Sequence, residues 1–419
     1  MNKKEHMIGL LFGLGIVIWG RYFLTSDMLF FRLTVGIGFG YTLSRGYTGF
    51  AGSVNRAYRT GSTRLMRTMA MMFFLTALMS IAVLFNEDPT TFDLWINPIN
   101  LGLLLGGILF GFGMTFSSCC ASGVLTDLVT ALPRGLITLI FFGFGVFVAF
   151  PIQNSASWVK ESWFSTEVGS KLSGGVYFPD LFKFDGLQGY LGAMILTGSL
   201  CALVIWLAHK YEVSRKNAGT YTGHSGEQVQ DLEVKESLKP ADDNTEWYDR
   251  IFVKAWSLRK AAVILSVLFT LLMGVTKAGW GASTPYGLWF GKVLLLFGVD
   301  ADSIAAFTMM PKDSFVKPFF EHPVSVQNFG ILLGTVFFLL TSGTFSKVCK
   351  SELRITPKQG FFYAIGGLLM GVGTRLANGC NVGALYTPIA NFSLSGWVFF
   401  AFLVTGGVLG NTVAKKLKL

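Results

Sequence analysis

The chain has 419 residues, of which 52% are hydrophobic and only 14% are charged. A soluble globular protein usually carries about 25% charged residues, so this chain has too little charge to cover a water-exposed surface. Its formal net charge is +10. In a soluble protein such an excess would suggest nucleic-acid binding. Here the basic residues lie in short runs between apolar stretches, which is typical of a protein in a lipid bilayer, and we expect no nucleic-acid partner.

Long apolar runs predict the membrane helices, because about 20 apolar residues span the hydrocarbon core of a bilayer. About ten runs approach this length, and the run at 29–44 is the weakest. They are residues 8–25, 29–44, 64–86, 100–117, 133–151, 187–209, 258–276, 326–343, 359–377 and 394–413. Four shorter runs are too short to cross: 48–60, 119–131, 287–298 and 380–391. The sequence therefore predicts an all-α integral membrane protein with about ten membrane helices and short re-entrant half-helices that are buried or line a cavity.

Residues 210–257 interrupt the apolar pattern. This stretch is dense in charge and contains no long apolar run. It predicts a polar, partly disordered cytoplasmic linker between a first membrane half, 1–209, and a second, 258–419. We expect that residues 215–245 can be shortened without loss of function.

Basic clusters predict the orientation of the chain. Lys3 and Lys4 precede the first span, and further Lys and Arg clusters lie at 56–67, 347–358 and 415–418. With ten spans, all of these clusters fall on one side of the membrane. Short loops rich in Lys and Arg remain in the cytoplasm, so both termini are expected in the cytoplasm, with the protein in the cell (inner) membrane.

The most informative feature is an internal repeat. Residues 106–113 and 366–373 share four glycines without a gap, and the later Cys120 and Gly123 recur as Cys380 and Gly383, all with the same offset of 260 positions. Gly-rich membrane helices can resemble one another by composition alone, but a match that also includes the Cys favours a true repeat. In the predicted order of spans the two segments cross in opposite senses, which indicates an inverted repeat.

Each copy of the repeat predicts a helix break followed by a short helix. Cys120 and Cys380 lie near the start of these short helices, where helix N-termini favour anions and thiolates. Two such ends facing inward would form an anion site at the midplane. There the thiols could hydrogen-bond a sulfur compound weakly or exchange with it. The candidate substrate-binding residues are Cys120, Cys380, Cys119, Gly123, Asn381, Gly383 and Arg375.

Other polar candidates carry weaker arguments. Cys201 and Cys349 lack the motif and are interpreted as packing residues. Cys119 is ambiguous, because its counterpart in the second copy is a glycine. A charge inside a membrane span indicates function by default, yet Arg375 could equally bind the carbonyls of a broken helix, and for Arg45 we favour that structural role. With four His residues and no Cys-x-x-Cys pair, no metal or cofactor is expected.

The motifs resemble the YeeE/YedE family of sulfur-compound transporters, in its two-half YedE-like branch. The resemblance is carried by the Gly-Gly-x-Leu-x-Gly-x-Gly run before Cys120, by Arg-Leu-Ala-Asn-Gly-Cys-Asn at 375–381, and by Phe-Ser-Leu at 392–394. It implies an inverted-repeat bundle with a central constriction and uptake of thiosulfate by transient contacts with cysteines. A separate cytoplasmic TusA-like sulfur carrier is a further implied partner. The family has a Cys after the first Arg, where this chain has Gly49.

Several functions are compatible with these residues. The leading hypothesis is a permease for thiosulfate or a related small sulfur oxyanion. A transporter of a selenium compound or a persulfide is the second. A membrane thiol-redox enzyme using Cys120 and Cys380 is the third, but the chain lacks a dinucleotide-binding or haem-attachment motif, and we expect no enzyme. A structural or insertion-type membrane protein would leave the repeat unexplained.

Overall fold

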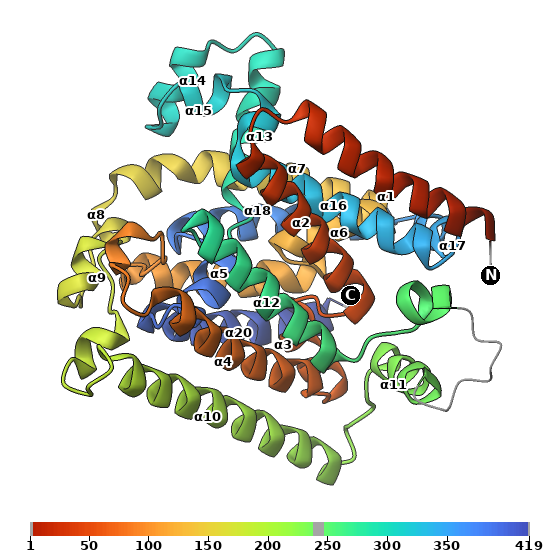
Figure 1. The fold of residues 1–419 in the computed structure, drawn as a ribbon, viewed down its shortest axis with the longest axis horizontal. Coiled ribbons are helices and arrows are strands. Elements are labelled where there is room, and N and C mark those ends of the chain that lie inside the picture. Colours follow the sequence, from red (N-terminus) through yellow and green to blue (C-terminus); the bar gives the residue numbers. More distant parts are fainter. Residues whose placement is uncertain (1–2, 238–246, 418–419) are drawn as a thin grey trace.

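The computed structural model describes residues 3–237 and 247–417, and within these ranges the protein is a bundle of helices without β-strands (Figure 1). The long helices are α1 (Lys3–Phe23), α2 (Asp27–Gly46), α4 (Arg64–Leu84), α5 (Leu101–Ser117), α7 (Leu132–Ser155), α10 (Tyr190–Asn217), α12 (Leu258–Thr276), α16 (Pro323–Thr341), α18 (Pro357–Leu376) and α20 (Leu394–Lys416). The prediction of an all-α membrane protein is confirmed.

Nine of the helical segments in the described ranges are long and apolar enough to span a membrane. The one remaining predicted span, 29–44, forms α2, which has 20 residues but does not meet this criterion of hydropathy. Its Arg32 and Arg45 are both buried in the protein. Because α2 packs between α16 and α12, these polar side chains face protein rather than lipid. A helix in this position does not need to be uniformly apolar.

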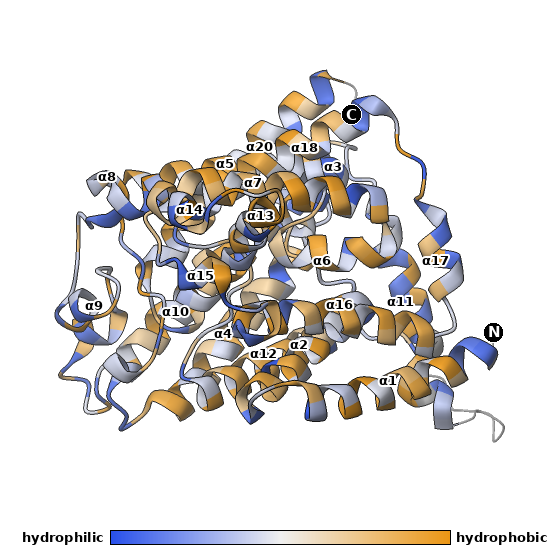
Figure 2. Ribbon diagram, turned by 90° about the horizontal axis from the view of Figure 1, so that it is seen from above, coloured by the Kyte–Doolittle hydropathy of each residue, from blue (hydrophilic) through white to orange (hydrophobic). Residues whose placement is uncertain are grey.

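The predicted half-helices are present as short helical segments. They are α3 (Gly52–Thr60), α6 (Ala121–Thr130), α13 (Thr284–Leu296), and the π-helical η5 (Asn381–Tyr386) with α19 (Thr387–Ala390). The remaining short α-helices of the described residues are α8 (Ser157–Lys160), α9 (Glu167–Lys171), α11 (Ser225–Ser237), α14 (Ala301–Thr308), α15 (Asp313–Val316) and α17 (Phe345–Ser351). We call the end of the bundle with α11 and α17 the α11 face, and the end with α8, α9, α14 and α15 the α14 face (Figures 1 and 2).

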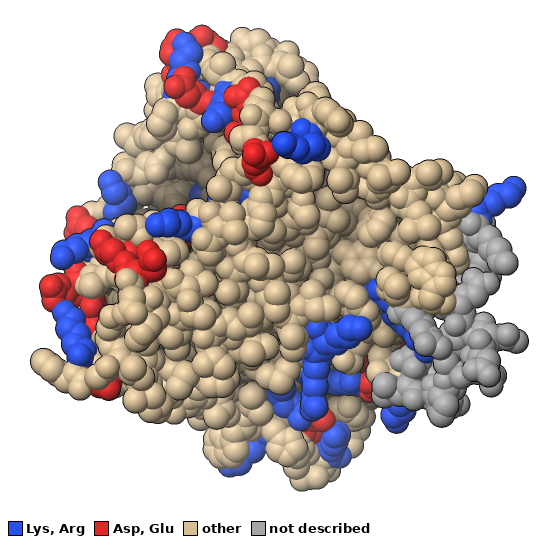
Figure 3. All heavy atoms as spheres, in the orientation of Figure 1, with Lys and Arg blue, Asp and Glu red and all other residues tan. Residues whose placement is uncertain are grey.

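An uncharged belt separates the two faces. Figure 3 shows the charged residues gathered near the two ends, with a broad surface of other residues between them, and the helices of this belt are mostly apolar (Figure 2). Large hydrophobic side chains are exposed there, including Leu11 and Leu14 of α1 and Ile195 of α10. An exposed apolar surface of this extent marks contact with lipid. The chain is therefore a multi-pass membrane protein.

The centre of the bundle is the crossing of α5 and α18. A Cβ atom on Gly106 would lie 2.6 Å from the carbonyl oxygen of Gly373, and one on Gly113 would lie 2.6 Å from that of Gly366. Close approach of backbones is the usual role of small residues in membrane helices. Because Gly106 approaches Gly373 at one end and Gly113 approaches Gly366 at the other, the two helices run antiparallel.

This crossing has the symmetry of an inverted repeat. An offset of 260 positions converts Gly106 into Gly366 and Gly113 into Gly373, so the contact at one end of the crossing is the counterpart of the contact at the other. The helices that flank the crossing follow the same symmetry. Helix α5 packs against α20 while α18 packs against α7, and α20 is the counterpart of α7. Two antiparallel, equivalent halves are expected when a two-fold axis lies in the membrane plane.

Within the predicted linker, residues 225–237 form the helix α11. Glu227 on this helix is buried and accepts hydrogen bonds from Arg56 at 3.0 Å and Ser62 at 2.6 Å. Gln230 donates to the carbonyl oxygens of Gly46 and Trp256. Polar residues that suggested a solvated chain thus bind polar groups of the membrane domain. Residues 238–246 of the predicted linker lie outside the described residues.

Candidate functional site

The first helix break lies between α5 and α6. Ser118 has a left-handed backbone with φ of +58°, which ends α5 and turns the chain. The hydroxyl of Ser117 donates to the carbonyl oxygens of Gly113 and Cys119. Cys120 is extended and precedes α6 without a capping hydrogen bond from its side chain. The first N–H groups of α6 therefore have no side-chain cap from Cys120 and can bind an anion.

The second break repeats this geometry between α18 and η5. Asn378, offset by 260 positions from Ser118, is also left-handed, with φ of +53°. Cys380 is extended and likewise provides no side-chain cap for the next segment. The predicted pair of Cys-containing breaks is thus present in both copies. The helices after the two breaks differ, since α6 is a regular α-helix and η5 is π-helical.

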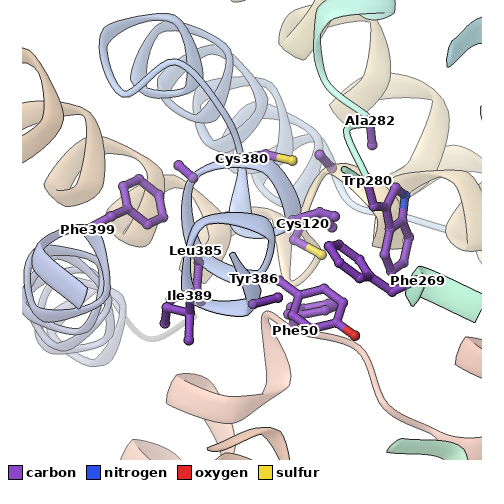
Figure 4. Close-up of a cluster of buried hydrophobic side chains, with 14 of the residues drawn as sticks. Phe50, Cys120, Phe269, Trp280, Ala282, Cys380, Leu385, Tyr386, Ile389 and Phe399 are labelled. Atoms are coloured by element: carbon purple, nitrogen blue, oxygen red, sulfur yellow. The ribbon is translucent and has the colours of Figure 1, made fainter. Parts of the chain in front are cut away.

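The thiols of both breaks lie in one buried cluster at the centre of the protein. The exposed fraction is 1% for Cys120 and 0% for Cys380, and Cys119 is buried beside them. Figure 4 shows Cys120 and Cys380 on neighbouring segments of this cluster, with the rings of Phe50 and Tyr386 close by. All three cysteines are free thiols. The two repeats thus bring the reduced sulfur of both helix breaks into one buried cluster, next to aromatic rings.

A cavity leads from the α11 face to the first break. Its volume is about 690 Å³, and it extends from His224 and Glu352 to Cys119 and Cys120. We call this cavity the vestibule. Burial and the positive charge of Arg56 lower the pKa of His224 below its usual value, so this ring is neutral at pH 7. The vestibule is large enough for a small oxyanion with several waters.

Three arginines line the vestibule: Arg56, Arg59 and Arg134. Arg134 makes two hydrogen bonds of 3.0 Å to Asp127 and an ion pair with Glu352, and Arg56 is paired with Glu227. Arg59 binds the side-chain oxygen of Asn411 at 3.0 Å and has no carboxylate partner within the described ranges. Its positive charge remains available to attract an anion.

Arg375 lies beyond the vestibule, in the last turn of α18 before the second break. Only 4% of it is exposed. Its terminal nitrogens donate to Gln153 and Ser283 at 3.2 Å each, and its Nε has no hydrogen-bond partner. No carboxylate of residues 3–237 and 247–417 forms an ion pair with it. A buried charge without a counter-charge is costly, so this guanidinium is suited to bind an anionic substrate.

Arg45 has the structural role that we favoured from the sequence. Its guanidinium donates to the backbone carbonyls of Ile251 and Lys254 and to the hydroxyl of Tyr41. It also lies over the ring of Trp256, 4.4 Å from the centroid. These contacts attach the chain before α12 to the end of α2. Arg45 and Arg375 are therefore both buried, but within the described residues Arg45 donates to backbone carbonyl oxygens, whereas Arg375 donates to the side chains of Gln153 and Ser283.

The structure divides the predicted site residues into two groups. Cys119, Cys120 and Gly123 line the vestibule, whereas the other four lie beyond it and are buried: Cys380, Asn381, Gly383 and Arg375. Cys201 and Cys349 lie outside both groups. Cys201 is buried on α10, and the Cys349 thiol on α17 lies 3.2 Å from the carbonyl oxygen of Val129.

Gly49 stands where the resemblance implies a thiol in the family. It lines the vestibule, and a Cβ atom there would meet nothing within 4 Å. The aromatic wall, formed by residues such as Phe50, Trp280 and Tyr386, was not predicted. With 15% aromatic residues in the chain, only the Gly-Trp-Gly run at 279–281 could have drawn attention to this wall.

Known transporters are similar to this chain in sequence. The thiosulfate transporter TsuA of Spirochaeta thermophila is 26% identical over 394 residues, which cover 90% of this chain and 97% of that protein. TsuA of Escherichia coli K12 is 21% identical over 388 residues, or 91% and 93% of the two chains. The probable transporter YedE of Escherichia coli K12 is 28% identical over 158 residues, and the match spans only 38% of each chain.

The family comparison covers most of the molecule. Residues 45–409 match the family described as sulphur transport, and this range includes both helix breaks, most residues that line the vestibule and the α5–α18 crossing. The relatives reported above are named as a probable transporter and as thiosulfate transporters, not as enzymes. The chain belongs to the sulphur-transport family.

Proposed function

We propose that the protein is an inner-membrane permease for thiosulfate or a related small sulfur oxyanion. One observation carries this proposal: two equivalent helix breaks place Cys120 and Cys380 in the same buried cluster, and the vestibule ends at the first of them. The TsuA relatives are named as thiosulfate transporters. A sulfur oxyanion suits this site because it combines negative charge with a soft sulfur atom.

The charges and the helix ends define a path for the anion. Near the second break, Arg375 supplies the positive charge that a desolvated anion needs. At the constriction, the free N–H groups of the half-helices receive the oxygens, and the thiols of Cys380 and Cys120 donate weak hydrogen bonds. In the vestibule, Arg59 and water replace these contacts. The thiols remain unmodified, so the anion can leave by diffusion.

The α11 face is proposed to be cytoplasmic. Arg56 and Arg59 line the vestibule, Arg64 pairs with Asp231 of α11, and Lys347 lies on α17 at this face, as does the C-terminal end of α20. The loops of the α14 face carry both signs of charge (Figure 3). Basic residues accumulate on the cytoplasmic side of membrane proteins. A separate TusA-like sulfur carrier would then meet the transported sulfur compound at the mouth of the vestibule.

Uptake by proteoliposomes tests the proposal. The purified protein should take up radiolabelled thiosulfate into sealed vesicles, and unlabelled sulfate should compete poorly. Selenite and a low-molecular-weight persulfide serve as competitors for the second hypothesis. Stronger competition by either of them than by thiosulfate would replace the proposed substrate, and absence of uptake would contradict the permease itself.

Serine variants test the role of the thiols. Cys120→Ser and Cys380→Ser should each lower uptake about tenfold or more, since a hydroxyl lacks the softness of sulfur. The matched controls are Cys201→Ser and Cys349→Ser, which lie outside the path and should retain full uptake. Full transport by the Cys120→Ser, Cys380→Ser double variant would show that the thiols do not handle the substrate.

A further inference from the structure

The vestibule has a counterpart on the α14 face that is filled by protein. The repeat relates α6, which lines the vestibule, to η5, which follows Cys380. On the α14 face, the space beside η5 is occupied by residues 92–97, from the connection between α4 and α5. Phe92, Leu94 and Ile96 of this segment have exposed fractions of 5%, 1% and 0%. We call residues 92–97 the lid segment.

Trp95 is the side chain of the lid segment that lies against the second break. Its ring fits between Gly281 and Gly383, and a Cβ atom on either glycine would collide with the ring. Gly383 follows Cys380 by three residues. The first repeat has no such cover, because Gly123 lines the vestibule and a Cβ there would meet only Cys119 and Cys120, at 3.4 Å. Equivalent positions are thus open at one break and covered by an indole at the other.

The lid segment is held by the burial of its apolar side chains and by hydrogen bonds to neighbouring loops. Asp93 pairs with residues 277–279 by two backbone hydrogen bonds of 2.8 and 3.2 Å, and Gly175 donates to the carbonyl oxygen of Ile96 at 3.0 Å. The side chain of Asn391 donates to the carbonyl oxygen of Leu94 at 3.2 Å. The Trp95 indole N–H donates to Asp93 at 2.9 Å. All of these groups lie outside the long membrane helices, so separation of the lid would not unfold a span, although it would expose the buried Phe92, Leu94 and Ile96.

The backbone of Trp95 is itself in an unfavourable conformation. Its φ is +57°, in the left-handed region that bulky L-residues rarely occupy. Such a conformation persists only where the surroundings hold it, and here the seat between two glycines does so. Separation of the ring from its seat would relieve the strain. The strained backbone therefore favours exchange between a seated and a released lid.

We propose that the lid segment is the gate of the transport path at the α14 face, and that Trp95 is the residue that closes Cys380 off from that side. This proposal rests on the proposed function as a transporter, but not on the identity of the substrate. The structure then represents a state that is open to the α11 face and closed to the α14 face. A substrate that enters from the α14 face must displace the indole before it reaches Cys380 and Arg375.

Thiol labelling tests the gate without any substrate. The reporter protein keeps Cys380 and carries serine at the other four cysteines, and membrane-impermeant maleimide is applied to right-side-out and to inside-out vesicles. Trp95→Ala should raise the labelling rate from the α14 face about tenfold or more, because access limits thiol reactivity. Trp163→Ala is the matched control, since that Trp is 57% exposed on the same face. Equal rates for Trp95→Ala and its parent would overturn the proposal.

A reversible cross-link tests the gate without removing the indole. Asp93 and Ala278 form a parallel bridge, and such neighbours are close enough for a disulfide. The Asp93→Cys, Ala278→Cys variant should lose uptake when oxidised and regain it when reduced, whereas Asp93→Cys alone should not respond. Unchanged uptake by the oxidised variant would refute the gate. If the parent transports no thiosulfate, the same cross-link should still slow the labelling of Cys380 from the α14 face, and unchanged labelling would refute the gate independently.

Discussion

The two helix breaks are built alike but differ in access. Ser118 and Asn378 make the same left-handed turn, and each is followed two residues later by a buried Cys with extended backbone. Cys120 lies at the end of the vestibule, whereas Cys380 is beyond it, behind the seat of Trp95. The difference comes from segments outside the repeated motif. The inverted repeat thus supplies two equivalent thiol sites that face opposite ends of the bundle, and the connecting loops decide which of the two is open.

The reactivity of the two thiols should show the largest difference. In single-Cys variants, Cys120 should react with a small thiol reagent added at the α11 face much faster than Cys380. If exposure of Cys380 requires an opening of about 3 kcal/mol, the ratio is roughly 100-fold. Mass spectrometry of labelled protein over time gives the two rates. Equal rates would break the comparison, because they would place both thiols at the end of the vestibule.

Replacement of Arg375 and of Arg59 compares a buried charge near the second break with an exposed charge in the vestibule. Arg375→Gln should lower anion uptake by roughly 10- to 100-fold, since a buried charged hydrogen bond is worth about 1.5–3 kcal/mol. Arg375→Lys should restore only part of the activity, because an ammonium lacks the planar fork of a guanidinium. Arg59→Gln, in the open vestibule, should cost less than tenfold because water screens exposed charges. Initial rates at several substrate concentrations separate affinity from turnover.

Substitutions at the helix crossing test whether the halves are equivalent. Gly113→Val and Gly366→Val enlarge the two partners of one contact and should each destabilise the protein by about 1–3 kcal/mol. Gly106→Val and Gly373→Val should have the same effect, because their contact is the counterpart of the first. Thermal unfolding in detergent, followed by size-exclusion chromatography, measures the change. Gly49→Ala is the control, since open space surrounds that position. Unequal effects within the set would show that the crossing is not symmetric.

Contacts of α11 should have the smallest effect on transport. Glu227→Gln removes a carboxylate whose side chain is 5% exposed beside Arg56, and Asp231→Asn removes the exposed partner of Arg64. Loss of a buried pair leaves an unpaired charge, whereas an exposed pair contributes about 0–1 kcal/mol. Faster proteolysis within 225–237 is expected for Glu227→Gln only. Uptake should fall by less than tenfold, as α11 covers the mouth of the vestibule and not its end.

Much of the architecture was predicted from local patterns. Apolar length marked the spans, and the offset of 260 positions located both breaks, because helices and turns depend on nearby residues. The weak span at 29–44 did form a helix, whose polar side chains are accommodated by its neighbours. The fold of α11 was missed, since composition does not show which charges find partners in distant segments. Trp95 was missed for the same reason, as its importance depends on glycines far away in the sequence.

The crossing of α5 on α18 has a consequence for how such a molecule can originate. Each half presents the same glycine surface, Gly106 with Gly113 or Gly366 with Gly373, to an antiparallel copy. A half-length ancestor that inserted into the membrane in both orientations would therefore meet its own inverted twin through these positions. Duplication and fusion of its gene would fix one copy in each orientation. The loops could then diverge separately, so that one side gained an indole cover and the other kept an entrance.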